Sequence, residues 1–228
     1  MGILRAMSGF LLLFDLDGTL VDTLPDLTRA LNEALRECGH VPLDPSEVRP
    51  MIGDGMAMLL ARGFAARGGE RPEADRMYQR FIEIYERVGV DRSRPYSGVA
   101  ETLTTLRRRG YRTAVATNKP QQATAAVLRG VGLAGLFDGF AGGDRYAVRK
   151  PDPGHLTALI GELGGEPGRA AMIGDSENDA AAARAAALPL LLMRYGYARI
   201  DPGALGANRV LDRFDEIPQA LDALGLRA

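Results

Sequence analysis

The sequence has little of what covalent cross-links, nucleic-acid binding or membrane insertion would need. Its one cysteine, Cys38, excludes an intramolecular disulfide and a metal site built from cysteines. The formal net charge is −1 and basic residues do not alternate with aromatic ones in a stripe, so no nucleic-acid partner is expected. No window approaches the roughly 20 apolar residues that span a membrane, and the N-terminus lacks the pattern of a signal peptide. We therefore expect a cytoplasmic protein that does not contact membranes.

The composition is that of a globular chain, with 228 residues of which 46% are hydrophobic and 25% charged. This length allows one domain of ordinary size and a smaller one. Short apolar runs alternate with helical patterns such as 99–109, which indicates a parallel sheet. Its strands are expected at 10–13, 112–116, 137–141, 170–174, 188–193 and 209–211. The predicted fold class is α/β, with a doubly wound, mostly parallel, Rossmann-like sheet.

A helical insertion separates the first strand from the rest of the sheet. Between 22 and 92 the apolar residues recur every three or four positions, at Leu24, Leu27, Leu31 and Leu35 and again at Met77, Phe81, Ile84, Tyr85 and Val88. We interpret 22–92 as a small helical cap domain, and 1–21 with 93–228 as the core domain. Such a lid can expel water from a site and supply contacts to the substrate.

Two carboxylates stand one residue apart at the exit of the first strand. Asp15 and Asp17 follow the apolar run 10–14, and Gly18 lets the backbone turn sharply and approach a ligand closely. At positions i and i+2 of a strand end both side chains can point the same way, so one can attack while the other handles protons. The alternative is an acidic turn that caps a helix.

Three more strand ends carry polar groups. Thr117 and Asn118 follow the strand 112–116, and Asp175 ends the strand 170–174 with Asp179 in the first turn of the next helix. Lys150 precedes a stiff Pro-Asp-Pro connector that fixes where the lysine points. Because an open α/β sheet binds ligands beyond the carboxyl ends of its strands, we expect these residues to share one crevice.

The order of these elements, DxDGT, a hydroxyl residue, a lysine and GDxxxD, resembles the haloacid dehalogenase superfamily of phosphohydrolases. Within it the chain looks most like the phosphoglycolate phosphatases, through the stretches 117–120, 149–153 and 195–197. The resemblance implies a Mg²⁺-dependent phosphomonoester hydrolase that works through an aspartyl-phosphate. It further implies a small phosphorylated metabolite as partner, with 2-phosphoglycolate as the expected substrate, and a monomer or homodimer.

The resemblance also implies roles for the catalytic side chains. Asp15 is the expected nucleophile, and Asp17 the acid and base that protonates the leaving oxygen and then activates water. Thr117 is expected to donate its hydroxyl to a phosphoryl oxygen, and Lys150 to balance the charge of the phosphate and Asp15. Lys150 could instead be a surface ion-pair residue.

Clustered carboxylates repel one another unless a cation lies among them, and hard oxygen ligands select Mg²⁺. The expected ligands are the Asp15 carboxylate, the Asp17 backbone carbonyl and Asp175. Asp179 is expected to support these ligands or to be a marginal ligand itself. Its alternative is a partner of the helix dipole.

Substrate recognition is expected from a cap loop at 52–56, whose glycines free backbone N–H groups for an anion at a helix start. A plain turn between helices is the alternative. Asp54 in this loop argues against a substrate carboxylate nearby. Asn118 could contact phosphate or be only a turn residue. The predicted substrate-binding residues are Gly18, Thr19, Asn118, Gly53, Asp54, Gly55 and Met56.

Several rival functions remain at this point. Another small sugar or organic phosphate could be the substrate. A phosphoglucomutase of the same superfamily gates its acid and base with a cap histidine, and the matching place here holds Leu27. A dehalogenase would lack the second aspartate, which is present as Asp17, and a non-catalytic phosphate-binding module could have lost it. His40 and His155 are expected at the surface or at helix caps.

Overall fold

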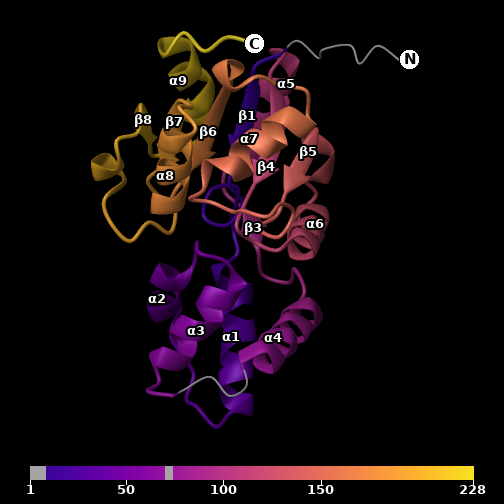
Figure 1. The fold of residues 1–228 in the computed structure, drawn as a ribbon, viewed down its shortest axis with the longest axis vertical. Coiled ribbons are helices and arrows are strands. Elements are labelled where there is room, and N and C mark those ends of the chain that lie inside the picture. The colour runs from indigo at the N-terminus through magenta and orange to yellow at the C-terminus, as the bar shows by residue number, and fades with distance from the viewer. Residues whose placement is uncertain (1–8, 70–73) are drawn as a thin grey trace.

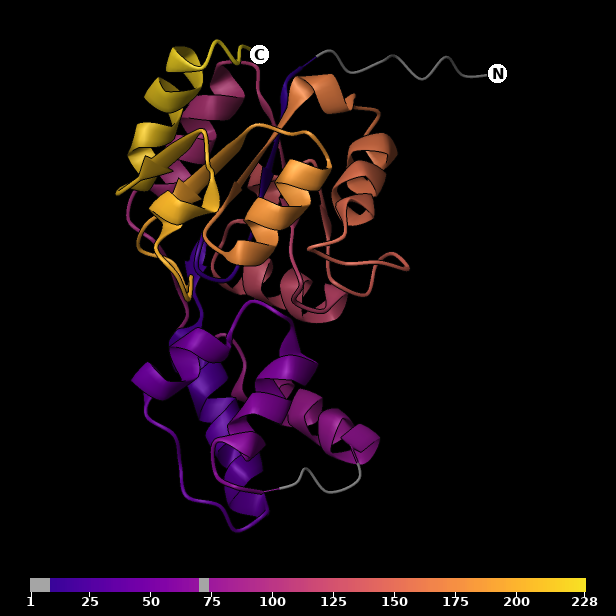
Figure 2. The ribbon, with the colours of Figure 1, turned by 60° about the vertical axis from the view of Figure 1, so that its left-hand side comes forward.

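The computed structural model describes residues 9–69 and 74–228. An α/β part contains the six-stranded sheet, and a separate group of helices lies beyond the carboxyl ends of its central strands (Figures 1 and 2). In the described part of the chain, no helix has the length and apolar character needed to cross a membrane. The predicted fold class is confirmed.

The sheet is parallel throughout, in the order β5-β4-β1-β6-β7-β8. The first strand of the chain lies at its centre, pairs with β4 on one side and β6 on the other, and marks the point where the strand order reverses. The strands are β1 (Leu11–Phe14), β4 (Arg112–Ala116), β5 (Gly139–Ala141), β6 (Ala170–Gly174), β7 (Leu190–Met193) and β8 (Arg209–Leu211). Only β5 and β7 begin two residues later than the sequence analysis expected.

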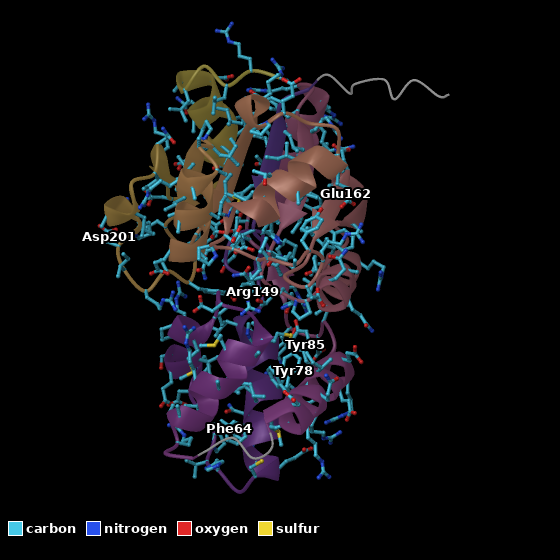
Figure 3. All side chains as sticks on the ribbon, viewed as in Figure 1. Phe64, Tyr78, Tyr85, Arg149, Glu162 and Asp201 are labelled. Atoms are coloured by element: carbon cyan, nitrogen blue, oxygen red, sulfur yellow. The ribbon has the colours of Figure 1, made fainter. Side chains whose placement is uncertain are left out.

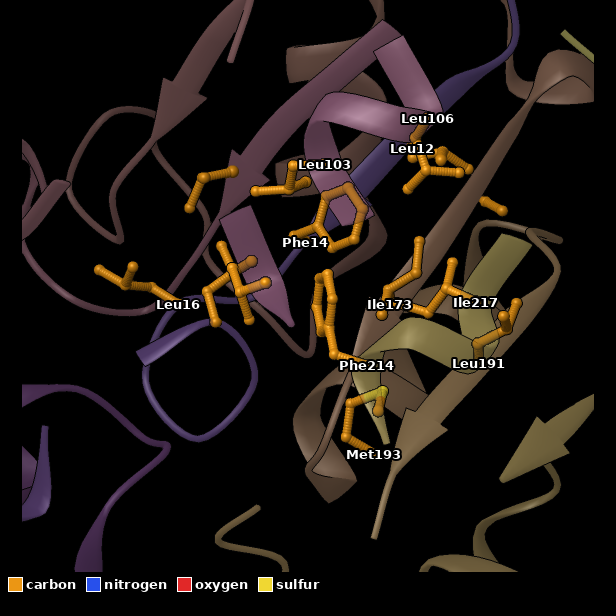
Figure 4. Close-up of a cluster of buried hydrophobic side chains, with 14 of the residues drawn as sticks. Leu12, Phe14, Leu16, Leu103, Leu106, Ile173, Leu191, Met193, Phe214 and Ile217 are labelled. Atoms are coloured by element: carbon orange, nitrogen blue, oxygen red, sulfur yellow. The ribbon is translucent and has the colours of Figure 1, made fainter. Parts of the chain in front are cut away.

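Helices cover both faces of the sheet because successive side chains of a strand point to opposite faces. Leu12 and Phe14 of β1 face one apolar cluster, shown in Figure 4, and Leu11 and Leu13 face the other. All four side chains are fully buried, so β1 has no room for a polar group before it ends. The first cluster is covered by α5 (Val99–Arg108), α6 (Gln121–Gly130) and α9 (Ile217–Ala223), and the second by α7 (Pro153–Glu162) and α8 (Glu177–Ala185).

The inserted helices have a core of their own. Leu27, Leu31 and Leu35 of the first helix are buried there with Phe64 and Phe81, as their three-to-four-residue spacing predicts. The helices of this part are α1 (Leu24–Glu37), α2 (Pro45–Val48), α3 (Met56–Ala65) and α4 (Ala74–Val88). Short 3-10 helices complete the described chain at η1 (Arg49–Met51), η2 (Ala134–Leu136), η3 (Pro167–Arg169), η4 (Pro202–Leu205) and η5 (Phe214–Glu216).

A two-stranded ribbon joins the two parts. The chain leaves the α/β part through β2 (Val21–Asp22) and returns through β3 (Arg94–Pro95), which pair antiparallel. The sequence analysis did not predict this ribbon, because two-residue strands carry no periodicity. Its position supports a division into a cap of 22–92 and a core of 1–21 with 93–228, which we propose as the domain boundaries. Residues 1–8 and 70–73 of these ranges lie outside the described residues.

His155, expected at the surface or at a cap, is instead buried in the first turn of α7. The helix is capped by Asp152, whose side chain accepts a hydrogen bond of 2.8 Å from the backbone N–H of Gly154. Nδ1 of His155 lies 3.3 Å from the carbonyl oxygen of Val148, and Nε2 is buried with no hydrogen-bond partner. Burial, with the nearby Lys150 ammonium, lowers the pKa of His155 from 6.5 to about 4.

We expect the protein to become less stable as the pH is lowered, because of this histidine. In the unfolded chain the histidine binds a proton below about pH 6.5, whereas in the folded protein His155 binds one only near pH 4. The contribution of the neutral histidine to the free energy of unfolding is therefore fully present above pH 6.5 and is lost as the pH falls toward 4. The full loss is about 3 kcal/mol. Urea unfolding at pH 7 and pH 4.5 measures it against a His155→Gln variant, which does not titrate. A stability difference between the two proteins that is the same at both pH values would contradict the prediction.

Candidate functional site

The site forms where the central strands end. Phe14 of β1 pairs in register with Val115 of β4 and Ile173 of β6, so these strands end close together. The residues that follow are Asp15 after β1, Thr117 after β4 and Asp175 after β6, and all are buried. The backbone N–H of Asp15 still donates to the carbonyl of Ile173, over 2.9 Å. The sheet thus brings together the residues that the sequence analysis expected in one crevice.

Three carboxylates gather in this crevice. One oxygen from each of Asp15, Asp175 and Asp179 lies within 4.8 Å of the others, and all three residues are buried. Burial raises the pKa of Asp15 to about 6 against the effect of the Lys150 ammonium, and Asp179 and Asp17 raise it further. Burial, with the neighbouring Asp179 and Asp15 carboxylates, also raises the pKa of Asp175 well above its ordinary value. This excess of negative charge on hard oxygen donors fits a divalent cation.

Lys150 reaches this cluster from the connector before α7. Its Nζ lies 2.6 Å from Oδ1 of Asp179 and 3.1 Å from Oδ1 of Asp15. Burial alone would lower the pKa of Lys150, but the two carboxylates raise it, so the side chain stays an ammonium. The residue is only 2% exposed, which rules out the surface ion pair that its sequence position also allowed.

Asp179 uses both carboxylate oxygens within the protein. Oδ2 accepts hydrogen bonds from the backbone N–H groups of Asp175 and Ser176, over 3.1 and 3.0 Å, and from the Ser176 hydroxyl over 2.8 Å. Oδ1 faces Lys150. Asp179 therefore caps the start of α8 and orients the lysine, which supports an indirect role toward a metal.

Asp175 is held by two donors of its own. The hydroxyl of Thr19 donates to Oδ1 over 2.5 Å, and the backbone N–H of Tyr197 donates to Oδ2 over 2.6 Å. Thr19 was expected at the substrate. Its hydroxyl instead orients Asp175, and a contact between Thr19 and the substrate stays a prediction.

Glycines allow this close packing of carboxylates. A Cβ on Gly18, whose φ is +87°, would lie 2.5 Å from Oδ2 of Asp175, and one on Gly196 would lie 2.1 Å from the Cβ of Asp175. A Cβ on Gly174 would lie 2.3 Å from Cγ of Asp179. The sequence analysis anticipated Gly18 but missed the other two. Gly196 faces Asp175, which is distant in sequence, and Gly174 faces Asp179, which the first turn of α8 brings back toward the strand.

Asp17 lies in a separate environment beside a lysine that the sequence analysis did not assign to the site. Nζ of Lys119 lies 3.1 Å from each oxygen of Asp17, and the hydroxyl of Thr23 donates to Oδ1 over 2.7 Å. The same ammonium lies 4.8 Å from the ring centre of Tyr85, on α4 of the cap. Burial alone would lower the pKa of Lys119, but Asp17 raises it above its ordinary value. Lys119 is therefore a buried cation between the cap and Asp17.

Composition offers a signal that could have found Lys119. The chain has twenty-six arginines and only two lysines, Lys119 and Lys150. Both lysines are buried and both pair with carboxylates of the strand-end site. In a chain that otherwise uses arginine for its cations, a lysine marks a position where a compact ammonium matters.

The cap loop is fastened to the core by its backbone. The carbonyl oxygen of Gly53 accepts hydrogen bonds from Nδ2 of Asn118, over 3.0 Å, and from Nδ2 of Asn178, over 3.1 Å. Asn118 also donates to the carbonyl of Lys150 over 2.9 Å. Asn118 thus joins the cap loop, the strand end and the lysine connector, and its contact with a phosphate stays a prediction.

Asp54 is neutralised by protein groups. Its carboxylate accepts hydrogen bonds from Asn178 over 2.6 Å and from Arg199 over 2.7 Å, and it pairs with Arg62. Although burial acts to raise it, these hydrogen bonds lower the pKa of Asp54 to about 2. The repulsion that a free aspartate would exert on a substrate carboxylate is therefore largely removed.

A small pocket lies between the cap and Asp17. It contains about 240 Å³ of space free of atoms, part of which is open to solvent. Figure 3 shows Tyr85 on the cap close to this junction. The residues that line the pocket are Asp17, Leu27, Ile52, Gly53, Gly55, Met56, Leu59 and Lys119. Of the predicted cap-loop residues, Gly53, Gly55 and Met56 are brought here, and Asp54 is not among the lining residues.

Comparison with known proteins agrees with this geometry. A family model described as haloacid dehalogenase-like hydrolase matches residues 11–187. A phosphoglycolate phosphatase of Caulobacter vibrioides is 41% identical over 222 residues, which cover 96% of this chain and 94% of that protein. One of Rhodospirillum rubrum is 44% identical over 208 residues, covering 89% and 86%.

Solved structures show the same fold. The crystal structure of a predicted phosphoglycolate phosphatase from Haemophilus somnus aligns with a TM-score of 0.88 at 32% identity, over 92% of this chain and 97% of that one. Since sequence and structure agree over nearly the whole length, the match is not confined to the strand-end motifs. The chain belongs to the haloacid dehalogenase-like hydrolase family.

Proposed function

We propose that the protein is a Mg²⁺-dependent phosphomonoester hydrolase that converts 2-phosphoglycolate and water to glycolate and phosphate. The observation that carries the proposal is the pairing of Asp15 with Lys150 and of Asp17 with Lys119 at one strand end. This arrangement gives two adjacent carboxylates separate environments, as a nucleophile and a proton carrier need. The relatives named phosphoglycolate phosphatase support the substrate.

In the first step a carboxylate oxygen of Asp15 attacks phosphorus and the bond to the ester oxygen breaks. Asp17 gives its proton to the leaving oxygen, which departs as the hydroxyl of glycolate. Asp15 must be ionised to attack. Oδ1 of Asp15 accepts the backbone N–H of Leu16 over 2.7 Å and faces the Lys150 ammonium, and both contacts favour the ionised form.

In the second step Asp17, now a carboxylate, takes a proton from water. The water oxygen attacks phosphorus, the bond between phosphorus and Asp15 breaks, and phosphate leaves. Thr117 stands at the end of β4 next to Asp15, placed to donate its hydroxyl to a phosphoryl oxygen. Lys150 balances the negative charge in both steps.

The Asp15 carboxylate, the Asp17 backbone carbonyl and Asp175 would hold Mg²⁺, with Asp179 supporting them. The cation would supply positive charge against the phosphoryl oxygens and the clustered carboxylates. The raised pKa values of Asp15 and Asp175 support such a cation, because a positive charge among these carboxylates would favour their ionised forms. Mg²⁺ rather than Ca²⁺ suits phosphoryl transfer because it keeps a small, regular ligand shell.

The rival functions are less well supported. Leu27, at the place of the mutase histidine, lines the pocket and brings no proton carrier. Asp17, which a dehalogenase lacks, is present and paired with the buried Lys119, and a binding module would have no use for this pair. A different small phosphate ester stays the main alternative substrate. The cytoplasmic location and a monomeric or homodimeric state stay predictions.

Asp15→Asn should abolish turnover, because an amide is not a nucleophile toward phosphorus and offers no charge to a cation. We expect kcat below about a hundredth of the wild-type value, and Asp17→Asn should lower it by about 10²–10⁴. Phosphate release at saturating Mg²⁺ measures both, and thermal unfolding checks that the variants fold. Residual activity of Asp15→Asn well above this limit would exclude Asp15 as the nucleophile.

Activity should disappear with EDTA, return with Mg²⁺ and stay low with Ca²⁺. Two matched variants separate the acidic residues. Asp175→Asn should raise the Mg²⁺ concentration needed for half-maximal rate by about 100-fold or more, and Asp179→Asn about tenfold less than that. Oδ2 of Asp179 already accepts three protein donors and Oδ1 faces the Lys150 ammonium, whereas each oxygen of Asp175 accepts one donor. Equal shifts in the two variants would show that both carboxylates bind the cation directly.

The substrate is tested by a panel of phosphomonoesters. Since the pocket beyond Asp17 is small, 2-phosphoglycolate should exceed hexose phosphates in kcat/KM by at least about tenfold, equivalent to about 1.4 kcal/mol of transition-state discrimination. p-Nitrophenyl phosphate gives the baseline for an ester that asks little of the cap. If hexose phosphates were turned over best, the glycolate assignment would fail while the hydrolase assignment would stand.

A further inference from the structure

We propose that Lys119 binds the carboxylate of the substrate and thereby determines specificity. The inference rests on the proposed function. It extends that function by naming the group that recognises the part of the substrate remote from phosphorus. Nζ of Lys119 is buried 3.1 Å from both oxygens of Asp17, and Lys119 lines the pocket between cap and core.

The pocket offers a carboxylate one cation. Its other lining residues are Asp17, whose carboxylate is already paired with Lys119, apolar side chains such as Leu27 and Leu59, and the glycines of the cap loop. A carboxylate that enters such surroundings loses its hydration, and the loss is compensated only by an opposite charge or strong hydrogen bonds. Among the described residues that line this pocket, Lys119 alone carries a positive charge.

The covalent structure of 2-phosphoglycolate matches this distance. Its carboxylate is joined to the ester oxygen by one carbon, so the two groups can only be a few ångströms apart. The ester oxygen must lie within hydrogen-bond reach of Asp17 to receive its proton. The ammonium that touches Asp17 is therefore within reach of the carboxylate as well. An ammonium has three donors, so Lys119 can serve Asp17 and the substrate together.

Other cations near the cap are engaged elsewhere. Arg49 donates to the carbonyls of Tyr195 and Gly196, while Arg62 and Arg199 neutralise Asp54. Lys150 pairs with Asp15 and Asp179. These contacts commit the four named cations to the loops at the junction or to the nucleophile.

The cap also fixes where the Lys119 ammonium lies. The ring of Tyr85, on α4, faces Nζ with its centre 4.8 Å away. A cation is attracted to the face of an aromatic ring, most strongly where water is excluded. When the cap covers the core, as here, this contact keeps the ammonium at the pocket wall, so recognition of the carboxylate is complete only with the cap in place.

The test compares two esters that differ in one group. 2-Hydroxyethyl phosphate has the carbon skeleton of 2-phosphoglycolate with an alcohol in place of the carboxylate. The measured quantity is the ratio of kcat/KM for the carboxylate ester to that for the alcohol ester, at saturating Mg²⁺. We expect Lys119→Met to lower this ratio at least about thirtyfold.

The ratio separates recognition from a general effect on Asp17. Loss of the ammonium also unpairs Asp17, which lowers kcat for both esters by a common factor and cancels in the ratio. Arg80→Met is the control, because it removes a cation that pairs with Glu37 and Glu83 on the outer surface of the cap, and its ratio should equal that of the wild type. Lys119→Gln, which keeps donors for Asp17, replaces Lys119→Met if thermal unfolding shows that the latter does not fold.

Two failures are distinguishable. A wild-type ratio near one would overturn the proposed substrate, and the inference with it. A high wild-type ratio that survives in Lys119→Met or Lys119→Gln, even with both rates reduced, would leave 2-phosphoglycolate as substrate and assign Lys119 only to the positioning of Asp17.

Discussion

Four carboxylates gather beyond two strand ends, three of them buried and Asp17 half-buried, and their pairing with two buried lysines is the constraint on which the rest of the structure depends. Asp15 and Asp179 share Lys150, Asp17 pairs with Lys119, and Asp175 is held by the Thr19 hydroxyl and the backbone N–H of Tyr197. Buried charges of one sign are costly unless paired. The strand register, the glycines around Asp175 and the cap of α8 all hold these groups at distances where pairing is possible.

The cap depends on the same charges. Its contacts with the core are made by groups that also serve the site: Asn118, which follows Thr117 and holds the carbonyl of Gly53, and Lys119, which lies under Tyr85. A change in the charge of Asp17 would therefore alter the contact between Lys119 and Tyr85 of the cap. Because interactions in a closed, poorly hydrated site are stronger than in water, cap closure and charge pairing reinforce one another.

Much of this was predictable because it is local. The central strand, the two carboxylates after it, the helical insertion and the approach of Asp175 follow from apolar runs and parallel topology. The burial of His155, the β2–β3 ribbon and the need for glycine at 174 and 196 depend on contacts between distant segments, which periodicity does not encode. Lys119 was missed for a different reason. In the sequence it stands beside a turn, where a lysine is usually exposed, and only the folded structure shows that it is buried.

Lysine is what distinguishes the two charge pairs from the ion pairs elsewhere in the chain. Arginine forms those described at the surface, such as Arg80 with Glu37, where a planar fork and a long solvated stem suit the carboxylate. At Asp15 and Asp17 the lysines are buried, and in the proposed reaction each would face its carboxylate alone and then with phosphate or substrate. A compact ammonium with three rotatable donors could follow that change without moving its stem. Both lysines of the chain lie at this site, paired with Asp15, Asp179 and Asp17, and the proposed chemistry gives a physical reason for lysine there.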